Sequence, residues 1–212
     1  LLSRTPRQFA FVGHPDDPNW SRWRREAFVA RLAQAGAACE DYPLPPAAKR
    51  DWSAERPRLC AWLKRLKKPA ALFAANDSRG RHVLDACLVA DLAVPYEVTV
   101  LGVNNDPLIC ETCIRPLSSI AVDDEMAGYE AAQLLDRLMQ GLEPPGRVVR
   151  YGPKEVVSRA STADLQLSDK LVIQALEFIR INSGLNIRIS DVAEHLGVTP
   201  RWAENRFKHA LG

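Results

Sequence analysis

Three clusters of polar side chains are the part of this sequence best suited to chemistry, and each follows a short apolar run. The clusters are His14 with Asp16 and Asp17, Asn76 with Asp77, and Asn104 with Asn105. Amides and carboxylates bind polar ligands because they offer hydrogen-bond donors and acceptors. Asn and Asp also form turns and helix caps, so each cluster alone has a purely local explanation. Three clusters at equivalent positions favour a ligand-binding site.

A second group of polar residues lies in the last two dozen residues, which predict two short helices around a tight turn. Ser190 caps the first helix, Gly197 ends it, and Thr199 caps a second helix that begins at Pro200. The second helix carries Arg201, Glu204, Asn205 and Lys208 outward at helical spacing. Such a helix fits the major groove of DNA, and an ordinary helical hairpin is the alternative.

Short apolar runs that alternate with helical patterns provide the framework for these clusters. The predicted strands cover residues 8–13, 37–41, 71–77, 99–103, 118–122 and 148–157. The predicted helices that lie between and after them cover residues 21–34, 53–66, 78–90, 123–140 and 168–182. This alternation predicts parallel βαβ units with helices on both faces of a sheet. Ligands bind such sheets beyond the carboxyl ends of the strands, where the three clusters are expected.

No catalytic or metal-binding pattern accompanies the clusters. The sequence lacks the GxxxxGK[ST], GxGxxG, GxSxG and HExxH motifs, and its four histidines are far apart. Adjacent carboxylates such as Asp123 and Asp124 face different ways, which argues against a shared proton. Cys110 and Cys113 form one CxxC pair, but no second pair or suitably spaced His completes a zinc site. We therefore expect no enzyme activity, no metal and no cofactor.

The composition is that of a soluble globular protein, with 47% hydrophobic and 25% charged residues. A net charge of +2 is too small to make the whole chain a nucleic-acid binder, so any DNA-binding surface must be local. No apolar run approaches the roughly 18 residues that a membrane span needs. Five scattered cysteines fit a reducing compartment, and we expect a cytoplasmic protein without a membrane partner.

From residue 9 onward the sequence resembles known regulators of transcription. The segments LFAANDSRGRHVLDACLVADLAVPYEVTVLGVNND and PLSSIAVDDEMAGYEAAQLL resemble the effector domain of Lac-repressor and ribose-binding-protein type regulators. The tail, SDKLVIQALEFIRINSGLNIRISDVAEHLGVTPRWAENRFKHALG, resembles the first half of an AraC-type DNA-binding domain. The order of the two parts is similar to that of bacterial regulators of xylose operons.

The resemblance implies a periplasmic-binding-protein-like α/β fold of parallel sheets with helices on both faces, followed by an all-α helix–turn–helix segment. Residues 1–162 would form a partial sugar-binding effector domain whose N-terminal part precedes Leu1. Residues 163–168 would be a linker, and residues 169–212 would be the first half of the DNA-binding domain. The second helix–turn–helix unit of that domain would follow Gly212.

The resemblance also implies which residues bind the sugar. Arg24, in the segment NWSRWRREAF, corresponds to an arginine whose guanidinium grips two hydroxyl oxygens. The other implied sugar-binding residues are Asn76 with Asp77, Asn104 with Asn105, and Trp52, which would pack on the sugar ring. The family usually has an aspartate where this sequence has Asn104. An amide both donates and accepts, whereas a carboxylate only accepts, so this difference affects which sugar is bound.

In the tail, the resemblance implies that Arg201, Glu204 and Asn205 contact DNA bases. Arginine pairs with guanine, asparagine with adenine, and glutamate accepts a hydrogen bond from the cytosine amine. Thr199, Arg206 and Lys208 would contact phosphates, which position the helix without reading sequence.

Together these residues predict a sugar-responsive, DNA-binding transcription regulator that acts as a homodimer. Its partners would be a double-stranded DNA operator and a monosaccharide effector, a pentose such as xylose. The sequence leaves open whether the sugar activates or represses. One alternative is a solute-binding protein of the same fold without a DNA role, and a second is an enzyme built on this fold.

Overall fold

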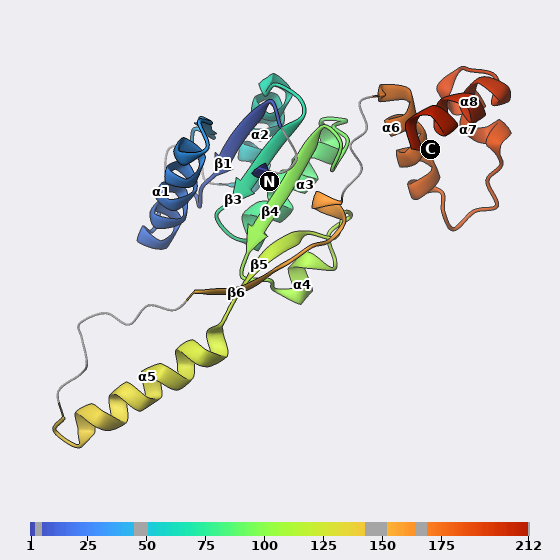
Figure 1. Ribbon diagram of the computed structural model, residues 1–212. Helices are drawn as coiled ribbons and strands as arrows, with labels where there is room; N and C mark the ends of the chain where they lie inside the picture. The colour runs from blue at the N-terminus through green and yellow to red at the C-terminus, as the bar shows by residue number, and fades with distance from the viewer. Residues whose placement is uncertain (3–5, 45–50, 143–151, 164–168, 212) are drawn as a thin grey trace.

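The computed structural model of the protein describes residues 1–2, 6–44, 51–142, 152–163 and 169–211. At its centre is a six-stranded sheet with the strand order β2-β1-β3-β4-β5-β6 (Figure 1). The strands are β1 (Gln8–Val12), β2 (Cys39–Asp41), β3 (Ala70–Ala74), β4 (Val98–Val103), β5 (Ser118–Val122) and β6 (Pro153–Val157). The first five run parallel, as predicted, whereas β6 pairs antiparallel with β5.

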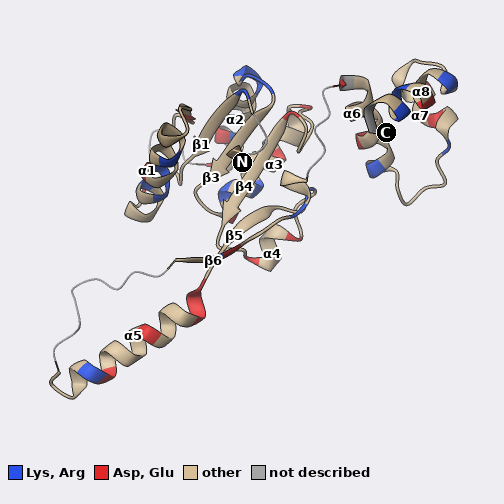
Figure 2. Cartoon of the chain, viewed as in Figure 1, with Lys and Arg blue, Asp and Glu red and all other residues tan. Residues whose placement is uncertain are grey.

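The segment after β5 extends away from this sheet in the structure. Helix α5 (Asp124–Met139) projects from the end of β5 and has no buried residue (Figure 1). It carries acidic side chains in its first turn, which Figure 2 marks in red. The return of the chain to β6 passes through residues 143–151, which lie outside the described residues. The predicted strand over residues 148–157 therefore corresponds to β6 only from Pro153 onward.

The last part of the chain consists of three helices that pack on one another. They are α6 (Lys170–Ile181), α7 (Ile189–Leu196) and α8 (Pro200–Leu211). Their shared apolar contact includes the buried side chains of Val172, Ala175, Val192, Ala193 and Ala203. Of the predicted linker over residues 163–168, residues 164–168 lie outside the described residues.

The turn between α7 and α8 forms as the sequence predicts, with one correction at its start. Gly197 has a φ of 65°, the left-handed conformation in which glycine ends helices. The Thr199 hydroxyl accepts a hydrogen bond from the Trp202 amide at 3.3 Å, so Thr199 caps α8. Ser190 does not cap α7, because α7 begins at Ile189 and Ser190 lies inside it. Arg188 holds the cap position, and its amide donates to the Asp191 carboxylate at 2.7 Å.

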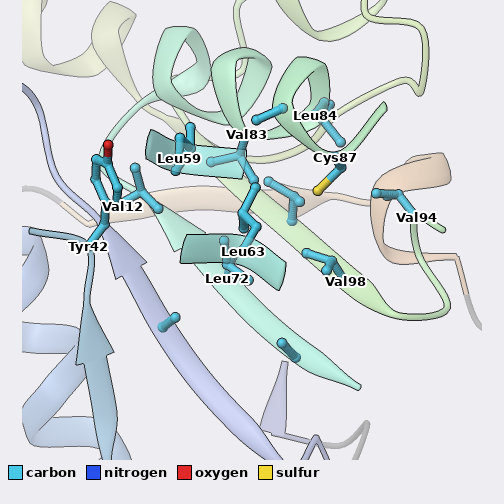
Figure 3. Packing of buried hydrophobic residues seen from close by; sticks show 14 of the residues in the cluster. Val12, Tyr42, Leu59, Leu63, Leu72, Val83, Leu84, Cys87, Val94 and Val98 are labelled. Carbon is cyan, nitrogen blue, oxygen red and sulfur yellow. The ribbon is translucent and has the colours of Figure 1, made fainter. Parts of the chain in front are cut away.

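Helices cover both faces of the sheet because successive strand residues point to opposite sides. On one face, α2 (Trp52–Arg65) and α3 (Asp77–Val89) pack their apolar residues against Ala10, Val12 and Leu72 (Figure 3). On the other face, α1 (Asn19–Gln34) packs Phe28 and Leu32 against strand side chains such as Phe11 and Phe73. The predicted α/β arrangement with helices on both faces is confirmed.

Among the helices of the described residues, none combines the length and the apolar character that a membrane span requires. Within the same part of the chain, no group of three or more His, Cys, Asp or Glu side chains could hold a metal ion.

A buried ion pair joins α2, α3 and the end of β1. Arg79 on α3 is 1% exposed and Glu55 on α2 is 2% exposed. The guanidinium donates to both Glu55 oxygens, at 2.7 and 3.0 Å, and its Nε donates to the Gly13 carbonyl at 2.9 Å. Because the pair is bidentate and further hydrogen-bonded, its geometry offsets much of the desolvation cost of burying two charges.

Breaking this pair should destabilise the protein strongly. The variant Glu55→Ala leaves the Arg79 guanidinium buried without its counter-charge, which costs about 3–5 kcal/mol. The matched variant Arg25→Ala removes the exposed ion pair between Arg25 and Asp41 and should cost less than about 1 kcal/mol. Urea unfolding of the 212-residue chain measures both values. Equal losses for the two variants would contradict the structural role assigned to the buried pair.

Candidate ligand-binding site

The three polar clusters follow β1, β3 and β4, which are neighbours in the sheet and run parallel. Two of the clusters meet. Asn76, Asn104 and Asn105 line one polar cavity of about 550 Å³ at the carboxyl ends of these strands. The other residues that line it are Asp77, Ser78, Asp106, Pro107, Ile109 and Asp124. This position is where open α/β sheets bind ligands.

The third cluster, after β1, is engaged in its own turn. The Asp17 amide donates to the His14 carbonyl at 2.9 Å, and the Asp16 amide donates to the His14 ring nitrogen Nδ1 at 3.2 Å. Arg22 pairs with the Asp17 carboxylate at 3.2 Å. The residues of this cluster therefore stabilise a local turn, which is a common role of Asp.

The amide side chains of the cavity are held by hydrogen bonds from the protein. Asn76 caps α3, and its Oδ1 accepts from the Arg79 amide at 2.9 Å. Asn104 and Asn105 have φ values of 111° and 55°, in the region that residues other than glycine rarely enter. Asparagine tolerates this region better than most residues. The two residues turn the chain sharply after β4 and so remain at the cavity.

Arg24 reaches the same edge of the sheet from α1. Its Nη1 donates to the Ala75 carbonyl at 2.6 Å and its Nη2 donates to Asn104 Oδ1 at 3.1 Å. Its guanidinium also lies over the Trp20 ring, 5.0 Å from the centroid. The structure therefore brings Arg24 together with Asn104, although the two are distant in sequence. Trp20 was not predicted as a site residue. Its position four residues before Arg24, on the same helix face, was the available signal.

Asp77 faces the protein with both carboxylate oxygens. Its Oδ1 accepts from the Ser119 hydroxyl at 2.5 Å and its Oδ2 accepts from the Asp106 amide at 2.8 Å. Burial raises the pKa of this carboxyl group above its usual range. These contacts tie α3 to β5 and to the loop after β4. In the structure Asp77 supports the cavity, and its predicted contact with a ligand stays a prediction.

Trp52 lies at an adjoining cavity of about 340 Å³, which Trp52, Ser78, Arg81, His82, Asp85 and Ile109 line. Ser78 and Ile109 line both cavities, so the two are contiguous. The Trp52 ring stacks on the His82 ring with centroids 4.1 Å apart and planes 11° from parallel. Burial, helped by nearby Arg79, lowers the pKa of His82. Burial therefore favours the neutral form of the stacked imidazole.

Arg159 also contacts a cavity residue, and it was not predicted from the sequence. It follows β6, and its Nη1 donates to Asn105 Oδ1 at 2.8 Å and to the Leu117 carbonyl at 3.0 Å. Arg159 and Asn105 are separated by 54 residues, and no periodicity or motif connects them. The pairing of β6 with β5 brings the guanidinium to Asn105.

The close approach of β4 to Asp77 requires a glycine at position 102. A Cβ atom there would lie 2.3 Å from Asp77 Oδ1 and 3.1 Å from a Leu117 methyl group. We predict that Gly102→Ala destabilises the chain by about 1–3 kcal/mol, because the added methyl group overpacks this contact. In the matched variant Gly128→Ala, which lies in α5, the added methyl group meets nothing within 4 Å apart from its chain neighbours and the backbone of its own helix, and it should stabilise by about 0.5–1 kcal/mol. Denaturant unfolding distinguishes the two signs, and a stabilising Gly102→Ala would contradict the geometry described.

Known proteins are similar to this chain over its whole length. The xylose operon regulatory protein of Haemophilus influenzae is 34% identical over 206 residues, which are 96% of this chain and 53% of that protein. The xylose operon regulatory protein of Escherichia coli K12 is 32% identical over 214 residues, which cover 100% of this chain and 55% of that protein. The chain thus spans about half the length of the curated relatives it matches.

Solved structures and a family model agree with these relatives. A structure described as the xylose-binding transcription activator xylR matches with a TM-score of 0.89 and 31% identity, covering 100% of this chain and 56% of that one. The predicted resemblance to regulators of xylose operons is confirmed. The model of the periplasmic binding protein-like domain matches residues 1–162. This chain therefore belongs to the periplasmic binding protein-like domain family.

Proposed function

We propose that the chain is part of a sugar-responsive transcription regulator that acts in the cytosol. The observation that carries this proposal is the polar cavity at the carboxyl edge of the sheet, where three asparagine side chains meet close to Arg24. Amide and guanidinium groups are suited to ligands with many hydroxyl groups, because each can make directed hydrogen bonds. The relatives are described as a xylose operon regulatory protein and a xylose-binding transcription activator, which supports a monosaccharide effector and a pentose such as xylose in particular.

In this proposal Arg24, Asn76, Asn104 and Asn105 contact the sugar directly. Trp52 contributes an aromatic face from the adjoining cavity, since sugar rings pack on aromatic side chains through their apolar C–H faces. Asp77 holds the loop that carries the two consecutive asparagines.

We further propose that α7 and α8 form a helix–turn–helix unit, with α8 entering the DNA major groove. On α8, the side chains of Arg201, Glu204 and Asn205 are exposed, whereas Ala203 on the same helix is buried. Thr199 and Lys208 are also exposed and suit phosphate contacts. Arg206 pairs with Asp169 next to the start of α6, so its phosphate contact would require that pair to open. Figure 2 marks the charged residues of these helices.

Sugar binding would act on DNA binding through the junction between α6 and the sheet. Glu177 on α6 forms an ion pair with Arg115, which lies in the segment between the cavity and β5. Arg180 donates to the Ile114 carbonyl of the same segment at 3.4 Å. A sugar that binds one arrangement of this segment more tightly shifts the population toward it and so repositions α6. We propose that the regulator does this as a homodimer on a double-stranded DNA operator.

Calorimetric titration of the full-length protein with a panel of pentoses and hexoses tests the proposed effector. We expect binding of D-xylose, and we expect Arg24→Ala to weaken it by about 10- to 100-fold, since a hydrogen bond to a charged group is worth about 1.5–3 kcal/mol. Arg25→Ala is the matched control, because Arg25 is the next residue on α1 and pairs with Asp41 away from the cavity. Binding of hexoses alone, or equal affinity for both variants, would contradict the proposal.

A further inference from the structure

The three cavity asparagines share a feature that decides which of their atoms can meet a ligand. In each of them Oδ1 accepts a hydrogen bond from the protein. The donors are the Arg79 amide to Asn76 at 2.9 Å, Arg24 Nη2 to Asn104 at 3.1 Å, and Arg159 Nη1 to Asn105 at 2.8 Å. A backbone N–H and a guanidinium can only donate. The atom that faces each of these donors must therefore be the amide oxygen.

The amide nitrogens are thus the atoms left for the cavity. Each Nδ2 carries two N–H donors, and none of the three has an acceptor within the part of the chain that the structure describes. All three residues line the same cavity. An N–H donor needs an acceptor when a ligand displaces its water, so the cavity favours ligand oxygens that accept.

We propose that Asn76, Asn104 and Asn105 form an amide donor trio, which binds monosaccharide hydroxyl groups as acceptors, and that Arg159 is the positioning residue that orients Asn105. This inference rests on the proposed function and assigns the polarity of its site. The sugar hydroxyl groups would in turn donate hydrogen bonds to the carboxylates that line the cavity, Asp106 and Asp124.

Arg159 is itself held firmly, which suits a positioning role. Its side chain also pairs with Glu111 at 3.7 Å, and its backbone amide donates to the Ser118 hydroxyl at 2.7 Å. It is 15% exposed. The guanidinium therefore stays in place without a ligand, and the Asn105 amide is oriented before the sugar arrives. Such preorganisation raises affinity by removing an ordering cost.

The variant Asn105→Asp tests the donor role, because it replaces the amide N–H₂ with a carboxylate oxygen, which accepts hydrogen bonds and cannot donate them. The carboxylate would still accept from Arg159, so the variant keeps the contact that holds this side chain. Titration of the full-length protein should show D-xylose affinity lower by about tenfold, the value of one hydrogen bond and the repulsion of a lone pair. Asn19→Asp is the matched control, because Asn19 Oδ1 also accepts from an arginine, Arg22, but lies outside the cavity. Its affinity should be unchanged.

The variants Arg159→Met and Arg159→Lys test the positioning role. Methionine cannot donate to Asn105 and should weaken D-xylose binding several-fold, whereas lysine keeps one donor and should restore most of the affinity. A purely packing role would favour methionine over lysine.

Three results would each contradict a different part of the proposal. D-Xylose affinity that is equal or higher in Asn105→Asp would overturn the donor trio while leaving the proposed function intact. Equal affinity in Arg159→Met and the unaltered protein would overturn the role of Arg159. Failure of every pentose and hexose to bind the unaltered full-length protein would instead contradict the proposed function, and the inference with it.

Discussion

The buried guanidinium of Arg79 is the constraint on which the binding edge of the sheet depends. It joins the end of β1 through Gly13, α2 through Glu55, and α3 through its own backbone. The Arg79 backbone amide also donates a hydrogen bond to the Asn76 side chain, which holds that side chain in place at the start of α3. A charge buried this deeply is stable only with its partners in place, so the strand end and both helix starts are fixed relative to one another. A cavity of directed hydrogen bonds requires such rigidity.

A second constraint fixes the other half of the cavity. The Asp77 carboxylate binds Ser119 and the Asp106 amide, and Gly102 leaves the space that this side chain occupies. The loop with Asn104 and Asn105 is therefore anchored at both ends. Arg24, which precedes this loop in the sequence, donates to Asn104, and Arg159, which follows it, donates to Asn105. The two guanidiniums hold amide oxygens, and the amide nitrogens remain for a ligand. Arg115, Glu177 and Arg180 connect the segment after this loop to α6.

Much of the fold follows from local rules, and the rest depends on contacts between distant residues. The parallel strands and their helices could be predicted because apolar runs and capping residues are local signals, and Gly197 marked the turn before α8 for the same reason. The antiparallel pairing of β6 and the contact of Arg159 with Asn105 could not be predicted, because both depend on tertiary pairing. Trp52 and Asp77 illustrate the same limit. Their residue types indicated a binding role, but burial and stacking decided their partners.

The proposed function requires a sugar cavity and a DNA-reading helix to act in one protein. The most direct test is selection of bound sequences from a random duplex DNA library by the full-length protein, with and without D-xylose. We expect enrichment of a defined sequence, affinity for that sequence that falls as salt rises, and a change in that affinity when D-xylose is added. A protein that binds D-xylose but enriches no DNA sequence in either condition would contradict it.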